Sequence, residues 1–176
     1  MSSLELPSVV YHGAPVRVTK PNPLLGADRK DFGRGFYTTP NLEQAKKFAR
    51  LKAKREGGPR GWVSSFRLMD VDDLAVKTFS VADHAWFDFV LAHRGFPELA
   101  DSVVTESVDV IVGPVANDAV GLVLNQFVNG TFGNRRSAPA KDIAISLLLT
   151  QRLHQQVFFA TVRACQQLEW IESTGV

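Results

Sequence analysis

"DFGRGFYTTP", residues 31–40, is the stretch that decides the fold, because it joins a glycine turn directly to a strand. Phe36, Tyr37 and the two threonines that follow favour extended backbone. Gly33 and Gly35 flank an arginine just before them, and glycine at a strand entrance marks a tight turn or a ligand that approaches the backbone closely. The stretch therefore predicts a strand whose entry turn borders a binding site.

The rest of the chain is predicted to mix strands and helices. Apolar and β-branched runs predict strands at 8–13, 16–18, 35–39, 61–69, 74–80, 108–113, 155–161 and 169–173, and the 3.6-residue period predicts helices at 41–55, between 80 and 95, and at 119–128, 140–153 and 162–168. We expect Thr39 and Pro40 to start the first helix and Ser80 with Asp83 to cap the second. The order lacks a strict βαβ rhythm, which favours an α+β fold in a single domain of 176 residues.

Composition excludes several classes of function. The chain carries 20 basic and 18 acidic residues, a net charge of +2, so charge alone gives no argument for nucleic acid or membrane. Cys165 is the only cysteine, which excludes an internal disulfide and a cysteine zinc site, and no histidine or carboxylate cluster predicts a metal. The first residues resemble no signal peptide and the apolar runs are too short for a membrane span, so we expect a cytoplasmic protein without a membrane partner. Export without a cleavable signal would leave no trace.

Two common motifs fail to explain the glycine turn. Asp-Phe-Gly at 31–33 matches the metal-binding triplet of protein kinases, but no glycine-rich phosphate loop or His-Arg-Asp loop precedes it. Gly33-x-Gly35 precedes a strand, whereas a dinucleotide fingerprint follows one and opens a helix.

Four motifs together carry a family resemblance. "YHG" at 11–13 and "FGRGFYTT" at 32–39 resemble the ADP-ribosyltransferase superfamily, in the branch typified by diphtheria toxin and the poly(ADP-ribose) polymerases. With "GPVAND" at 113–118 and "QQVFF" at 155–159, the chain is most similar to a bacterial family of uncharacterised proteins assigned to that superfamily. The resemblance implies an ADP-ribosyltransferase-like split β-sheet core with flanking helices, and a bent NAD, as co-substrate, in the cleft between two small sheets.

The resemblance also assigns roles to single residues. It implies that His12 bonds a ribose hydroxyl of the adenosine half, and that Tyr37 stacks on nicotinamide, whose flat aromatic amide suits a tyrosine face. The Gly13 backbone would bind the carboxamide. Arg34 would reach the pyrophosphate. The full expectation is a catalytic set of His12, Tyr37 and Gln156, and a cofactor-binding set of Gly13, Arg34, Gly35, Thr38, Asn117 and Asp118.

Gln156 is the main departure from the family pattern. It occupies the position of the glutamate that, in the polymerases, stabilises the positive charge of the breaking glycosidic bond. A glutamine can hold a ribose hydroxyl but offers no negative charge. Loss of this electrostatic stabilisation lowers the rate by factors of about 10² to 10³. We expect either a slower mono-transferase, an acid supplied from elsewhere, or a binder without catalysis. Asp118, expected on a loop after a strand broken at Gly113-Pro114, is the acidic candidate.

The leading prediction is an NAD-dependent mono-ADP-ribosyltransferase, a glycosyltransferase that releases nicotinamide and modifies a protein or nucleic-acid acceptor. The resemblance suggests a bacterial toxin or effector, a class that can act with an antitoxin or chaperone. The first alternative is a non-catalytic NAD or ADP-ribose binding module that lost the glutamate. A protein-interaction domain and transfer of an RNA phosphate onto NAD are further alternatives; the latter needs several convergent basic side chains, and only Arg34 is well placed.

Overall fold

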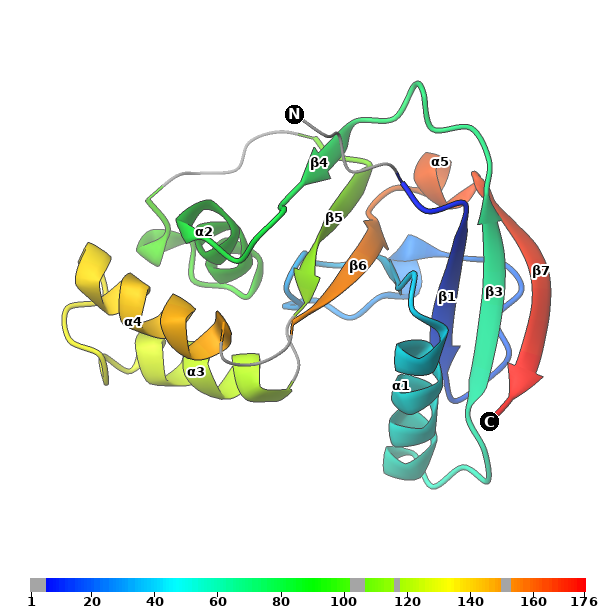
Figure 1. Cartoon of the computed structure of the whole chain (residues 1–176), viewed down its shortest axis with the longest axis horizontal. Coiled ribbons are helices and arrows are strands. Elements are labelled where there is room, and N and C mark those ends of the chain that lie inside the picture. The colour runs from blue at the N-terminus through cyan, green and yellow to red at the C-terminus, as the bar shows by residue number, and fades with distance from the viewer. Residues whose placement is uncertain (1–5, 102–106, 116–117, 150–152) are drawn as a thin grey trace.

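Two sheets and their flanking helices make up the fold. The computed structural model describes residues 6–101, 107–115, 118–149 and 153–176. Within these residues one sheet has three strands in the order β1-β3-β7 and the other has four in the order β2-β6-β5-β4 (Figure 1). All paired neighbours are antiparallel except β4 and β5. The expected α+β class and the division into two sheets are confirmed.

The elements follow the predicted order closely. The strands are β1 (Val9–Ala14), β2 (Phe36–Thr38), β3 (Trp62–Leu68), β4 (Val76–Thr78), β5 (Val110–Val115), β6 (His154–Phe159) and β7 (Leu168–Gly175). The helices are α1 (Leu42–Arg55), α2 (His84–His93), α3 (Asp118–Val128), α4 (Ala138–Leu149) and α5 (Val162–Cys165), with short 3-10 turns η1 (Pro23–Leu25) and η2 (Pro97–Leu99). Among the described residues, no helix has both the length and the apolar character needed to cross a bilayer.

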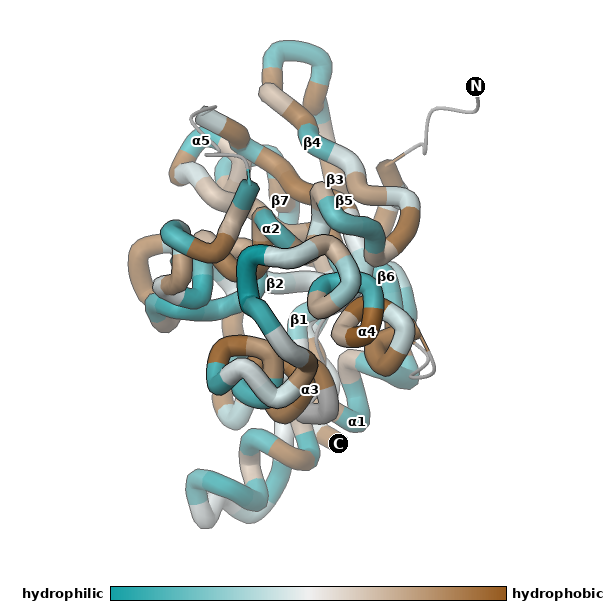
Figure 2. Tube along the Cα trace, turned by 90° about the vertical axis from the view of Figure 1, so that its left-hand side faces the viewer, coloured by the Kyte–Doolittle hydropathy of each residue, from teal (hydrophilic) through white to brown (hydrophobic). Residues whose placement is uncertain are grey.

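Two apolar clusters hold the layers together. The first lies between the four-stranded sheet and helices α2, α3 and α4, and includes Phe32, Phe89, Phe127 and Phe158. Helices α3 and α4 run side by side over it. Figure 2 shows both helices in front, in a view from the side of the molecule away from the three-stranded sheet. The second cluster joins the two sheets to each other; its members include Val10, Phe36, Phe66, Val112, Val157 and Phe159. The space between the sheets is therefore packed, not open.

The two sheets meet where β1 passes the end of β2. The N–H of Tyr11 donates to the carbonyl of Thr39 (2.8 Å), and the N–H of Thr39 donates to the carbonyl of Tyr11 (2.9 Å). On the other side β1 pairs with β3, with Gly13 opposite Val63. This single bridge places the residues around His12 next to those around Tyr37.

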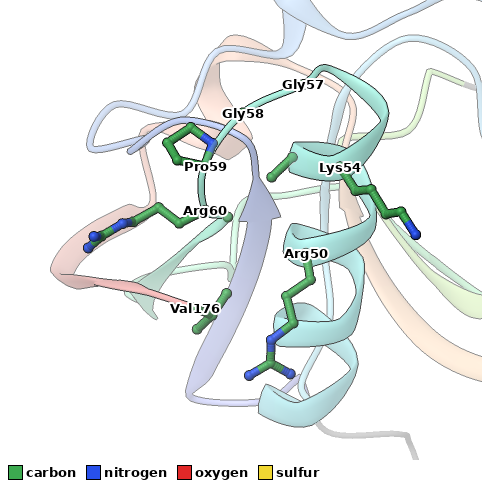
Figure 3. Close-up of a pocket in the computed structure, with 9 residues that line it drawn as sticks. Arg50, Lys54, Gly57, Gly58, Pro59, Arg60 and Val176 are labelled. Carbon is green, nitrogen blue, oxygen red and sulfur yellow. The ribbon is translucent and has the colours of Figure 1, made fainter.

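Helix α1 packs closely on β1 at Gly13. A Cβ atom added to Gly13 would lie 2.4 Å from the carbonyl oxygen of Ala45 and 3.0 Å from the nitrogen of Ala49, so only glycine fits. Ala45, Ala49 and Ala53 form the buried stripe of the helix. Its C-terminal end borders a surface hollow beside the glycine turn at 57–58 (Figure 3).

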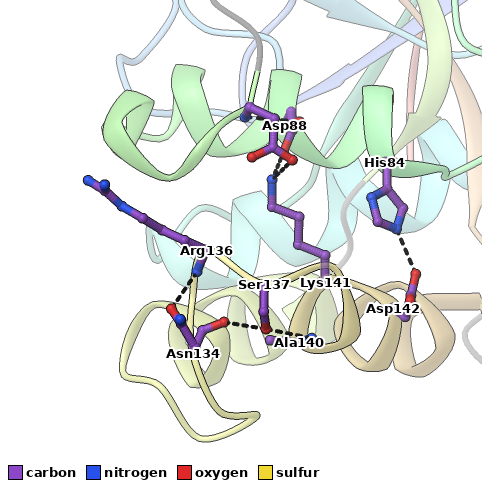
Figure 4. A network of polar contacts seen from close by, with 9 residues as sticks. His84, Asp88, Asn134, Arg136, Ser137, Ala140, Lys141 and Asp142 are labelled. Carbon is purple, nitrogen blue, oxygen red and sulfur yellow. Dashed lines mark hydrogen bonds and ion pairs between the residues drawn. The ribbon is translucent and has the colours of Figure 1, made fainter.

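A buried ion cluster joins α4 to α2. Lys141 is fully buried, and its Nζ lies 2.7 Å from a carboxylate oxygen of Asp88 and 2.7 Å from one of Asp101 (Figure 4). Burial opposes the charged amine, but the hydrogen bonds to Asp101 and Asp88 outweigh it and raise the pKa of Lys141. Nearby, His84 Nε2 lies 2.6 Å from Asp142 Oδ1. These contacts fix α4 against α2.

The expected strand at 16–18 is wrong. Pro15 has no N–H to donate to a sheet. The N–H of Val18 donates to the hydroxyl of Ser64 (3.2 Å) instead of a strand neighbour, and Arg17 lies over the ring of Trp62, 4.8 Å from its centroid. The segment is therefore held by side chains of β3.

The expected break at Gly113-Pro114 is also wrong, because β5 continues to Val115. Gly113 pairs with Gln156 and Pro114 with Gln155. The carbonyl of Pro114 accepts a hydrogen bond from the Trp86 indole N–H (3.0 Å), so this polar group is satisfied outside the ladder.

The helix starts differ in detail from the prediction. Asn41 caps α1 by accepting from the N–H of Gln44, while the Thr39 hydroxyl accepts from the N–H of Asn41. Asp83 alone caps α2 by accepting from the N–H of Trp86. In both cases the side-chain Oδ1 atom, of Asn41 or of Asp83, reaches a backbone N–H in the first turn of the helix.

Candidate functional site

His12 is held as a neutral acceptor beside β2. Its Nδ1 lies 2.7 Å from the carbonyl oxygen of Tyr37, and its ring stacks on Phe36 with centroids 4.3 Å apart. Because a carbonyl only accepts, Nδ1 carries the hydrogen. Burial lowers the pKa of His12 to about 4, the hydrogen bond to Tyr37 opposes this shift, and the charge of Lys52 adds to it. The remaining nitrogen, Nε2, is thus an acceptor suited to a hydroxyl.

The backbone of Gly13 faces the edge of β1 that β3 does not cover. Tyr11 uses its N–H and carbonyl on that edge to bond Thr39, and residues two apart in a strand point their backbone groups the same way. Within the part of the chain that the structure describes, no hydrogen bond to Gly13 is formed on that edge. An adjacent N–H donor and C=O acceptor are the pair that a carboxamide requires.

Tyr37 fixes the glycine turn through its hydroxyl. The hydroxyl donates to the carbonyl of Gly33 (2.8 Å) and accepts from the N–H of Phe32 (3.1 Å). Its ring lies 4.6 Å from that of Phe158, in a tilted arrangement, and is half-buried. Burial raises the pKa of Tyr37, so the phenol stays neutral.

The rings of Tyr37 and His12 lie on opposite sides of β2. Successive side chains of a strand alternate between faces, and His12 stacks on Phe36, the neighbour of Tyr37. The two rings therefore do not face each other. A ligand that touches both must extend along the junction of β1 and β2, with different parts at each ring.

Gln156 shares the Tyr37 face of the four-stranded sheet. It lies two residues before Phe158, which pairs with Tyr37, and it is opposite Gly113. Its side-chain oxygen is buried and, among the described residues, has no hydrogen-bond partner. The same is true of the side-chain oxygen of Gln155, on the other face of β6. A buried amide oxygen without a partner is uncommon in a protein and is suited to a ligand or water.

Three other expected cofactor residues already have contacts within the protein. Arg34 is exposed and forms a two-pronged ion pair with Asp28, at 2.9 and 2.6 Å. The Thr38 hydroxyl donates to the carbonyl of Val157 (2.6 Å). At Gly35 an added Cβ would lie 2.3 Å from the ring of Phe158, so this glycine lets the turn close on the sheet.

The GPVAND segment is described only in part. Asp118 is the first residue of α3 and does not lie on a loop, which corrects that prediction. Asn117 lies outside the described residues. The roles expected for Asn117 and Asp118 therefore stay predictions.

Lys52 of α1, whose charge acts on His12, was not expected at the site. Lys52 is half-buried, with Nζ 4.7 Å from the centroid of the Phe48 ring. Burial first, and then the charge of Lys30, lower the pKa of Lys52. The signal was present in the sequence, because Lys52 shares the apolar face of the helix with Phe48, where a lysine is out of pattern.

Two surface hollows lie away from His12 and Tyr37. One, of about 340 Å³, borders the end of α1. The other, of about 270 Å³, is lined by Gln155, Pro114 and apolar side chains that include Val81 and Leu153. The second hollow adjoins the strand pair that carries Gln156 and Gly113. Among the described residues, no group of histidine, cysteine and carboxylate side chains could hold a metal ion.

A family model described as "Protein of unknown function (DUF3990)" matches residues 8–170. The chain belongs to the DUF3990 family. The match extends from β1 into β7, so the DUF3990 region contains His12, Tyr37 and Gln156 together. No curated protein and no solved structure matches the chain.

Proposed function

We propose that this DUF3990 chain is an NAD-dependent mono-ADP-ribosyltransferase. The observation that carries the proposal is the junction of β1 and β2, where the free backbone edge of Gly13 lies next to a neutral His12. A carboxamide fits the first group and a ribose hydroxyl the second. In NAD the nicotinamide presents the carboxamide and the ribose of the adenosine half presents the hydroxyl, and the order of motifs in the chain supports the same assignment.

In the proposed reaction the bond from nicotinamide to ribose C1 breaks, and nicotinamide leaves with the bonding electrons. An oxygen or nitrogen of the acceptor forms the new bond to C1 and loses its proton. Tyr37, held by Gly33 and Phe32, would supply a fixed aromatic face for nicotinamide. Gln156, whose buried oxygen lacks a partner, would accept a hydrogen bond from a ribose hydroxyl. It supplies no charge, so the reaction is expected to be slow.

The test is release of nicotinamide from NAD by the purified chain, followed by chromatography. Tyr37→Ala is expected to weaken NAD binding by up to about tenfold through loss of a stacking partner. Tyr37→Phe is the matched control, because it keeps the ring and removes only the hydroxyl. Equal NAD binding by all three proteins, with each folded by circular dichroism, would exclude Tyr37 from the site.

The second candidate is a non-catalytic NAD or ADP-ribose binding module. It is favoured by the neutral amide at Gln156, the position where an acid is expected. Binding of NAD without release of nicotinamide would support the module over the enzyme. Neither binding nor release would point to a protein-interaction domain.

A role as a toxin or effector belongs to the same proposal. It predicts that expression of the wild-type chain slows growth of a bacterial host and that Tyr37→Ala relieves the effect. Growth arrest that persists unchanged with the variant would separate toxicity from NAD chemistry.

A further inference from the structure

The hollow at the end of α1 has a positive rim. It is lined by Arg50, Lys54 and Arg60, by glycines of the turn at 57–61, and by Val176, and its lining holds no acidic side chain (Figure 3). Lys47 lies on the same side of α1, three residues before Arg50 and seven before Lys54, a spacing that aligns side chains along one helix face. All four cations are exposed. We call Lys47, Arg50, Lys54 and Arg60 the α1 basic face.

The cations of this face lie apart from the ion pairs of the described residues. On helix α1, Lys46 pairs with Glu43 at 2.6 Å. Among the described residues, no ion pair joins a cation of the α1 basic face to a carboxylate. Cations in the last turn of a helix also offset its dipole, but that effect is limited to the terminal turn. Lys47 precedes that turn and Arg60 follows it.

The basic face continues onto the three-stranded sheet. An atom at the Cβ position of Gly175 would lie 3.4 Å from Nη1 of Arg60 and 3.9 Å from the ring of Trp62. Arg17 lies over the same Trp62 ring, at 4.8 Å. The positive charges therefore extend from helix α1, past the glycine turn at 57–61, to Arg17 beside the ring of Trp62.

The shape of this surface selects the class of ligand. Figure 3 shows Arg50, Lys54 and Arg60 extending in different directions from the rim instead of converging on one point. A single small anion needs convergent donors, whereas a polymer with a charge about every 3.4 Å along each strand can meet separate cations. Arginine forks match phosphate oxygens. We propose that the α1 basic face binds the phosphate backbone of a nucleic acid, without reading its sequence. This proposal is independent of NAD chemistry.

The experiment measures binding of a fluorescein-labelled single-stranded oligonucleotide by fluorescence anisotropy, without NAD. Four phosphate contacts predict that the affinity falls about 50-fold between about 50 and 200 mM salt. Removal of two contacts in Arg50→Ala/Lys54→Ala is expected to reduce this to about sevenfold. The matched control is Arg135→Ala/Arg136→Ala, which removes the same charge from the loop between α3 and α4 and should keep the wild-type salt dependence.

Each outcome decides the proposal. A reduced salt dependence in the α1 variant alone supports it. It is overturned if the wild-type chain does not bind, or if both double variants change equally. Displacement of the oligonucleotide by polyglutamate at equal charge concentration would overturn it in favour of an acidic protein partner. All four substituted side chains are exposed, so thermal unfolding is expected to be unchanged in both variants.

Discussion

Replacing Gln156 by glutamate tests whether β6 carries the reaction centre. The substitution keeps the size of the side chain and adds the negative charge that a developing ribosyl cation needs. If NAD is bound as proposed, nicotinamide release should rise by about 10² to 10³, the usual value of such an electrostatic interaction. The gain requires the ionised carboxylate, so the rate should increase with pH.

The structure also sets the cost of this change. The Gln156 side-chain oxygen is buried without a partner, and burial raises the pKa of a carboxyl above its ordinary value of about 4.3. The folded state then binds more protons than the unfolded state. The free energy of unfolding should therefore fall as pH rises above about 4.3, by about 1.4 kcal/mol per pH unit, until the folded-state pKa is reached. Activity and stability should change in opposite directions with pH.

The assay compares wild type, Gln156→Glu and Gln155→Glu for nicotinamide release between pH 5 and pH 9, together with urea unfolding at each pH. Gln155→Glu is a matched control, because its side-chain oxygen is also buried without a partner but lies on the other face of β6. It should lose stability without gaining activity. A folded Gln156→Glu protein with no gain, or an equal gain from both variants, would refute the assignment of Gln156 to the reaction centre.

Three further predictions concern groups with well-defined surroundings. Lys141→Met should lower the free energy of unfolding by about 3–5 kcal/mol, because Asp88 is left buried without its cation. The double variant Lys141→Met/Asp88→Asn should recover most of this loss. Additive losses from the two substitutions would contradict the pairing. Because burial lowers the pKa of His12 from 6.5 to about 4, the free energy of unfolding should be highest above pH 6.5 and fall by about 3 kcal/mol towards pH 4. The fall should be smaller in His12→Asn. Urea titrations at each pH measure both. Burial raises the pKa of Cys165 to about 12, so iodoacetamide should label this thiol only after unfolding, and mass spectrometry of the native protein would reveal any earlier reaction.

The sequence predicted the elements well because local signals and packing agree. The strand predicted at 35–39 contains β2 (Phe36–Thr38), and the amphipathic pattern predicted at 41–55 contains α1 (Leu42–Arg55). It failed at 113–115, where glycine and proline suggested a break. There the ladder to β6 and the Trp86 indole, both distant in sequence, supply the hydrogen bonds that keep β5 extended.

The contacts of the expected site residues within the protein could not be read from the sequence. Thr38 and Arg34 carry polar groups that suit a cofactor, yet their contacts are Val157 and Asp28. The neighbourhood of His12 and Tyr37 was predictable from the motifs, but not the alternation that sends their rings to opposite sides of β2.

Pro114 has a consequence for how other chains can approach the four-stranded sheet. The carbonyl of Val112 accepts from Phe79 on the β4 side, and Pro114, two residues on, directs its backbone to the same side. There its nitrogen has no hydrogen to give and its oxygen is taken by Trp86. Beyond the end of β4, this edge of β5 therefore cannot pair with an added strand. The sheet is thereby protected from fibril-like stacking of chains. A protein acceptor would have to be selected there by side chains and surface shape, not by backbone pairing.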